Sequence, residues 1–300
     1  MAIPTQERFV LRNSAGTFIS LSGPIYVLDH AGLGLVKPER AARSGPYQHG
    51  QTLANARLGP RTITLKLAIQ ADTEADVWVA SQALEQIFNQ LDAAIFLDVT
   101  RPDTETRRLR VAHGDGWTLP RKASDVYNQI PDVLQLVADD PIAYVNEWRV
   151  ITLGVGVGGT GTPVPTLVPM SVGASAIDET KTETYRGTWF SLPIVRFTGP
   201  LVDPVLENLT TEEKLDLTSV TLSGGEWIEI DCRYGYKTAV DESGNNRLED
   251  LTTDSDLATF HLAPADEATN GVNEFRATAT GATSGSRITI RYLQFYQGVL

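Results

Sequence analysis

Short stretches in which apolar and polar residues alternate dominate this chain. Between Arg61 and Gln70, every second residue from Ile63 to Ile69 is a large aliphatic one. A period of two is typical of a strand with one buried face. The same pattern predicts strands over residues 107–112, 132–138, 226–236, 273–279 and 287–292, with inward side chains that include Leu109, Val111, Val133, Val137, Ile228, Ile230, Cys232, Tyr234, Phe275, Ala277, Ile288, Ile290 and Tyr292.

One stretch has helical spacing instead. From Glu74 to Leu91, apolar residues recur at intervals of three and four and form a single stripe: Val77, Ala80, Leu84, Ile87, Phe88 and Leu91. Thr73 followed by Asp76 has the spacing of a capping box, which predicts the start of this helix. One helix among many short strands favours a mainly β fold, a sandwich or barrel, over alternating βαβ units.

The length and the distribution of charge indicate two domains. The chain has 300 residues, about twice the size of the commonest domain. Residues 1–140 carry 14 basic and 16 acidic residues, whereas residues 141–300 carry 11 and 21. We therefore expect one domain over 1–140 and a second over 141–300, with a long Gly/Pro-rich loop over 154–185.

Composition excludes several classes of function. The 25 Lys and Arg against 37 Asp and Glu give a net charge of −12, the wrong sign for a protein that grips phosphates, so we expect no direct nucleic-acid binding. A single cysteine excludes an internal disulfide and a cysteine-based zinc site. The sequence has neither a secretory signal nor an apolar run long enough for a membrane span. We expect synthesis in the cytoplasm.

No motif predicts a catalytic, cofactor or metal site. Gly154, Gly156 and Gly159 spell G-x-G-x-x-G, but the following Thr-Gly-Thr-Pro-Val-Pro cannot open the helix that a dinucleotide site needs. The four histidines are scattered, there is no G-x-S-x-G, and Cys232 falls at an inward position. The oxygen-rich loop over 241–247 departs from the calcium-loop pattern and is typical of a hairpin turn, although calcium binding stays open.

Two functions of other classes stay open. Trp227, Glu229, Asp231 and Arg233 form the outward row of a predicted strand, and such a row, or an exposed Trp189, is a candidate sugar-binding surface. A β-sandwich glycosidase needs two carboxylates, whose separation is set by the fold and not by spacing in the sequence. We favour an ordinary solvated strand face over both.

Several segments, in order along the chain, resemble the distal tail proteins of long-tailed bacteriophages. They are Gly32-Leu-Gly-Leu, Pro46-Tyr-Gln-His-Gly50, Leu58 through Leu67, Asp139-Asp-Pro-Ile-Ala-Tyr144, Arg186 through Gly199, Gly225 through Asp231, Gly244-Asn245 and Leu262 through Asn273. Each segment alone is weak, so the specificity lies in their order and spacing. The long 154–185 stretch and the absence of a glycine after Pro264 depart from the family pattern.

The resemblance implies a structural virion protein without catalysis or cofactor. Its first domain would form a ring, a homohexamer, and its second would be a galectin-like β-sandwich. The ring would join the tail tube and tape-measure protein to the tail-tip hub and its host-recognition apparatus. A carbohydrate-binding or receptor-binding tail protein is the alternative, and a fold by itself does not decide between these functions.

Overall fold

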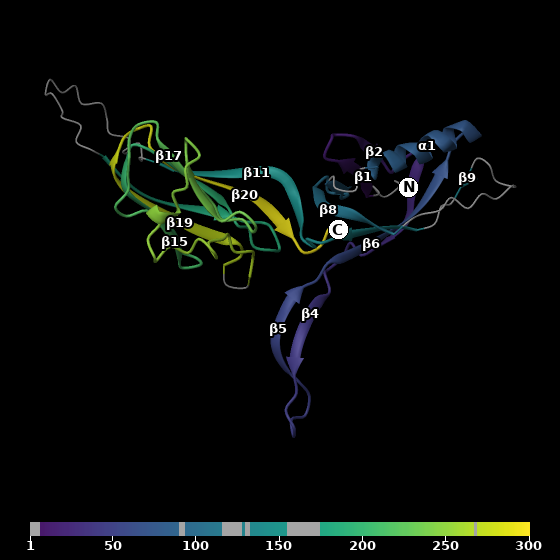
Figure 1. Ribbon diagram of the computed structural model, residues 1–300, viewed down its shortest axis with the longest axis horizontal. Coiled ribbons are helices and arrows are strands. Elements are labelled where there is room, and N and C mark those ends of the chain that lie inside the picture. Colours follow the sequence, from purple (N-terminus) through teal and green to yellow (C-terminus); the bar gives the residue numbers. More distant parts are fainter. Residues whose placement is uncertain (1–6, 90–93, 116–127, 130–132, 155–174, 267–268) are drawn as a thin grey trace. The chain divides into compact units, whose positions relative to one another are not determined.

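The computed structural model describes residues 7–89, 94–115, 128–129, 133–154, 175–266 and 269–300 (Figure 1). The described chain is mainly β with one α-helix, as its sequence predicted. It has two compact units: unit 1 comprises Met1–Asn146 and Tyr296–Leu300, and unit 2 comprises Glu147–Phe295. Unit 1 is therefore discontinuous in sequence, which no sequence pattern predicted.

Unit 1 consists of antiparallel strands and the helix. Its elements are β1 (Arg8–Asn13), β2 (Phe18–Ser20), β3 (Ile25–Ala31), β4 (Pro38–Arg43), β5 (Thr52–Leu58), β6 (Arg61–Gln70), α1 (Glu74–Ile87), β7 (Ile95–Thr100), β8 (Thr106–Asp115), β9 (Asn128–Gln129), β10 (Leu134–Ala138) and the start of β11 (Ala143–Gly154). Pairing runs in the order β2-β1-β7-β8-β10-β6-β3, and β9 adds to β6. Strands β4 and β5 pair only with each other.

Strand β6 lies at the centre of the unit 1 core. Its bounds are those predicted from the alternation, and its four aliphatic side chains from Ile63 to Ile69 are fully buried. It pairs with β3 on one side and β10 on the other. The close approach of β6 also requires a glycine at position 32. Gly32 has φ +85°, and a Cβ there would lie 2.1 Å from the carbonyl oxygen of Thr62.

The helix packs its predicted apolar stripe into this core. Val77, Ala80, Leu84 and Ile87 are buried, and the N-cap Thr73 accepts a hydrogen bond from the amide of Asp76. The helix ends at Ile87, earlier than the predicted residue 91, because Phe88 leaves helical geometry. Leu91 lies outside the described residues.

The predicted inward face of β10 is wrong by one residue. Val133 is exposed, and Leu134, Leu136 and Ala138 are buried instead of Val133 and Val137. The sequence Val-Leu-Gln-Leu-Val-Ala has apolar residues in both phases, so alternation cannot choose a face. The choice is made by pairing with β6, which places Leu136 opposite Ile63.

Unit 2 contains two antiparallel sheets. Its remaining elements are β12 (Ser175–Thr184), β13 (Ile194–Thr198), β14 (Leu201–Asn208), β15 (Glu213–Asp216), β16 (Thr221–Leu222), β17 (Trp227–Asp231), β18 (Thr238–Asp241), the 3-10 helix η1 (Leu248–Asp250), β19 (Val272–Ala282) and β20 (Arg287–Tyr296). One sheet has the order β18-β17-β13-β20-β11, and the other β12-β19-β14-β15 with β16 on β14. The inward side chains of both sheets share one core, so unit 2 is a β-sandwich.

Two sequence predictions for unit 2 need correction. Residues 175–184 form strand β12, so the expected loop over 154–185 is wrong for its last part. Thr-rich β12 buries little apolar surface and is held by its backbone pairing with β19, which hydrophobic alternation does not reveal. Residues 155–174 lie outside the described residues. Tyr234 is 69% exposed because β17 ends at Asp231, before the predicted end at Tyr236.

Candidate assembly surfaces

The β4–β5 hairpin, which we call the arm, is the most exposed element of unit 1. It extends away from the end of β6 (Figure 1), and every residue of β4 is exposed, as is every residue of β5 except Leu58. Residues 37–58 contain four basic residues and one acidic residue, and Arg57 pairs with Glu39 at 2.8 Å. An extended hairpin without a core is not stable by its own packing. The arm therefore contributes little to the packing of unit 1 and leaves both of its faces exposed.

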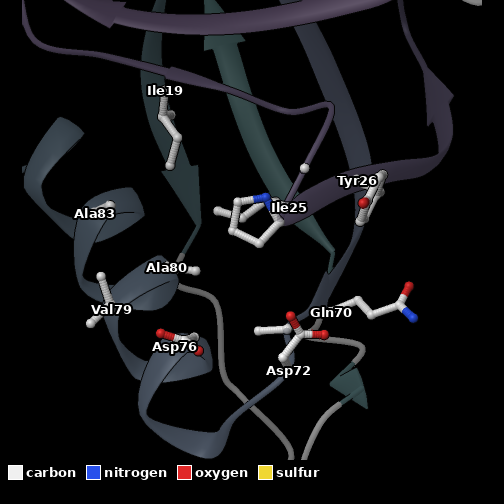
Figure 2. Close-up of a pocket in the computed structure, with 12 residues that line it drawn as sticks. Ile19, Ile25, Tyr26, Gln70, Asp72, Asp76, Val79, Ala80 and Ala83 are labelled. Atoms are coloured by element: carbon white, nitrogen blue, oxygen red, sulfur yellow. The ribbon is translucent and has the colours of Figure 1, made fainter.

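A groove of about 760 Å³ lies on the same unit between α1 and the β2–β3 connection (Figure 2). Its wall is mainly apolar, with Ile19, Ile25, Tyr26, Val79 and Ala83 facing the space. Asp72 and Asp76 lie at its end near the start of α1. Residues 72–88 contain four acidic residues and no basic one, so this surface has the opposite charge to the arm.

Two arginines fix the base of the arm and the segment Tyr296–Leu300. Arg61, only 4% exposed, donates to the carbonyl oxygens of Gly32 and Gly34 at 3.2 and 3.0 Å and also to that of Gln297. Burial lowers the pKa of Arg61. Arg107 donates to the carbonyl of Gly298 at 2.9 Å, and its guanidinium stacks on Tyr296. The predicted strands contained both arginines, but nothing in the sequence indicated their partners.

Cys232 is buried, and two of the histidines form pairs with carboxylates. Cys232 is fully buried, and burial raises its thiol pKa to about 12, so the thiolate is scarce at neutral pH. His261 pairs with Glu213 at 3.0 Å and His30 with Glu7 at 3.2 Å. Within the described ranges, no three His, Cys, Asp or Glu side chains gather as a metal site would require.

The oxygens of the 241–247 loop are used within the loop. Asp241 accepts hydrogen bonds from the amides of Ser243 and Asn245 and from the side chain of Asn245. These bonds close the turn after β18, and the hydrogen bonds from Asn245 lower the pKa of Asp241.

The predicted outward row of Trp227, Glu229, Asp231 and Arg233 lies beside arginines of the strands β13 and β20. Glu229 accepts from Arg196 and Arg291 at 2.7 and 2.9 Å, and Asp231 pairs with Arg233 at 2.7 Å. Asp231 is 8% exposed and is thus not the open carboxylate that the alternation placed outward. The side-chain hydrogen bond that Arg233 donates to Asp231 raises the pKa of Arg233.

No helix in the part of the chain that the structure describes is long and apolar enough to span a bilayer.

A family model matches much of unit 1. Residues 19–147 match the phage tail protein RIFT-related domain, a range that contains the arm, β6, α1 and the groove. No curated protein matches the chain. The similarity to a phage tail domain thus falls within unit 1 and the first residue of unit 2.

Solved structures match nearly the whole chain. The crystal structure of the SPP1 Dit protein, described as a paradigm of the hub adsorption apparatus in phages that infect Gram-positive bacteria, matches with a TM-score of 0.65 at 14% identity. The match covers 96% of this chain and 98% of that one. Structures of the phage p2 baseplate with Ca and with Sr match at 9% identity and TM-scores of 0.44. The resemblance to a siphophage distal tail protein that the sequence indicated is confirmed by the family model and by the Dit fold.

Proposed function

We propose that this chain is a structural component of a phage tail tip, in which copies of unit 1 form a closed ring. The ring joins the tail tube and the end of the tape-measure protein to the tail-tip hub and the host-recognition apparatus. The observation that carries this proposal is the phage tail domain over residues 19–147, on a chain with the fold of a Dit protein. A non-catalytic role accords with a buried Cys232 and arginine-paired Glu229 and Asp231.

The ring contact that the surfaces of unit 1 support best is the arm of one copy on the groove of the next. The arm carries an excess of basic residues. On the α1 side of the groove, all the charged residues are acidic. Opposite charges favour this encounter and disfavour contact between two like surfaces. A contact between two different patches is heterologous and closes into a ring when the rotation between copies allows it.

Light scattering and electron microscopy of the purified full chain test this proposal. We expect closed rings with a mass several times 32.6 kDa, about sixfold for a hexamer. The double variant Arg40→Glu/Arg43→Glu reverses two charges on the exposed arm and should shift the protein to monomers at moderate salt, because it replaces attraction by repulsion.

The matched control is Lys181→Glu/Arg276→Glu, which reverses two charges on β12 and β19 of unit 2. It should leave the rings intact. A full chain that stays monomeric at its highest soluble concentration, also with tail-tube and hub proteins added, contradicts the ring. Rings that tolerate the arm variant as well as the control contradict the arm contact alone.

A further inference from the structure

Aromatic rings and guanidinium groups gather on the outward face of the β18-β17-β13-β20-β11 sheet in unit 2. Arg196 lies 4.2 Å from the ring centre of Trp227 on β17. Arg291 on β20 lies 6.0 Å from Trp148 on β11, and Arg233 lies 5.7 Å from the same ring. Four elements, distant in sequence, thus present their side chains on one face.

Carboxylates hold the arginines of this row in place. One oxygen of Glu229, Oε2, accepts hydrogen bonds from Nε of Arg196 at 2.9 Å and from Nη2 of Arg291 at 2.9 Å. Asp231 binds Arg233 through both oxygens. Register explains the convergence, because Arg196 lies opposite Glu229, and Ile194 lies opposite both Asp231 and Arg291.

Two aromatic rings of the row are open to solvent. Trp148 is 44% exposed, and Tyr236, on which Arg233 stacks at 4.4 Å, is 59% exposed. Exposed tryptophan and tyrosine rings beside ordered polar groups are typical of binding surfaces rather than of ordinary solvated strands. The arginines beside these rings are already held by carboxylates, so their order does not have to be established when a ligand binds.

Three arginines, Arg196, Arg233 and Arg291, gather on this face and pair with the carboxylates of Glu229 and Asp231. Residues 141–300 as a whole contain 21 acidic and 11 basic residues. Guanidinium groups gathered on one face of an otherwise acidic unit can pair with an anionic ligand there.

We propose that this face binds a saccharide that carries an anionic group such as a uronate. The apolar face of a sugar ring would stack on Trp148 and Tyr236, and the anionic group would pair with Arg291 or Arg233. Glu229 and its arginines supply an acceptor beside donors, which is what hydroxyl groups require. An acidic peptide has carboxylates for the arginines but lacks hydroxyl-rich flat rings, so the aromatic and carboxylate groups favour a sugar. The site lies within unit 2 and does not depend on the ring.

Calorimetric titration of the full chain with oligogalacturonate, oligoalginate and hyaluronan oligosaccharides tests the site. We expect binding of at least one of them, accompanied by a change in tryptophan fluorescence, and no binding of its methyl-esterified neutral counterpart. Trp148→Ala should weaken binding by about fivefold or more through the lost stacking surface, and Arg291→Ala should weaken it and reduce its salt dependence.

Matched controls separate the site from a general effect of the substitutions. Trp78→Ala removes a tryptophan that is 46% exposed on α1, and Arg276→Ala removes an arginine paired with Asp178 on the other sheet of unit 2. Both should bind like the unaltered protein.

Three outcomes overturn the proposal. They are the absence of binding to all three anionic saccharides at about 10 mM, equal weakening by the controls and the site variants, and binding of polyglutamate as tight as that of the best saccharide. The last result identifies the face as a site for acidic protein segments. Ring formation is measured separately from saccharide binding. A failure of this proposal is therefore distinct from a failure of the proposed function.

Discussion

At the scale of single residues, His261 couples the stability of unit 2 to pH. Its Nδ1 lies 3.0 Å from Oε2 of Glu213, and the same oxygen accepts hydrogen bonds from the hydroxyl of Thr211 and the amide of His261. The hydrogen bond with Glu213 raises the pKa of His261, although burial acts in the opposite direction. Burial works against ionisation of Glu213, but hydrogen bonds led by that of His261 lower its pKa.

The raised pKa of His261 predicts the sign of a pH effect. A histidine with a higher pKa in the folded state contributes stability that is complete below the unfolded value of about 6.5 and is lost as pH rises through the folded value. In urea unfolding, unit 2 should therefore lose stability as the pH rises above about 6.5, and His261→Gln should abolish this loss. His49→Gln, on the exposed arm, is the control and should keep the loss. An identical pH profile for His261→Gln and the unaltered chain would contradict this coupling.

At the scale of elements, α1 is stable because it packs, and not by its sequence propensity alone. Its last turn contains no basic residue, and its N-terminal cap and first-turn acids are the favourable local features. An isolated helix of 14 residues is marginal in water, so burial of its stripe carries most of its stability.

Leu84→Ala should lower the free energy of unfolding by about 2–5 kcal/mol, because Leu84 is fully buried in the unit 1 core and its removal leaves a cavity. Thermal and urea unfolding measure this. Val79→Ala, on the same helix but 64% exposed, should change stability by less than about 0.5 kcal/mol. Equal effects of the two substitutions would mean that the helix does not bury Leu84 against the unit 1 core.

At the scale of the whole molecule, the chain crosses from unit 1 to unit 2 and returns. Val299, fully buried, belongs to the unit 1 core, and its amide donates to the carbonyl of Leu33 at 2.8 Å. Arg61 and Arg107 hold the neighbouring carbonyls. The division into domains 1–140 and 141–300 stays a prediction, since two compact units do not show that either folds alone.

Removal of residues 297–300 should destabilise unit 1 selectively. The deletion exposes the core contacts of Val299 and removes an acceptor from each of two buried arginines, the carbonyl of Gln297 from Arg61 and that of Gly298 from Arg107. Loss of an acceptor is costly for a buried charged group. Hydrogen exchange should become faster in β6 and β8 and stay unchanged in β13 and β17. Replacing Leu300, 38% exposed, by alanine is the control. Uniform acceleration in both units would instead show that they unfold together.

The sequence by itself determined those features of the elements that depend on residues close together in the chain. The bounds and buried face of β6, the stripe and cap of α1 and the inward positions of β19 and β20 follow from a period of two or 3.6, because a single buried face imposes that period locally. The order of turn residues further indicated the family. Where apolar residues occupy both phases, as in β10, or where a strand is nearly all polar, as in β12, that signal vanishes.

Tertiary structure alone decided which distant groups meet. Arg61 reaches Gln297 across 236 positions, and Arg291 shares Glu229 with Arg196 across three strands. Trp148 on β11, outside the predicted row on β17, lies beside Arg291 of the neighbouring strand β20 and also within 5.7 Å of Arg233. Such contacts are set by register and pairing, which depend on the free energy of the whole sheet. A charged side chain in a linear sequence has no pattern that reveals its partner.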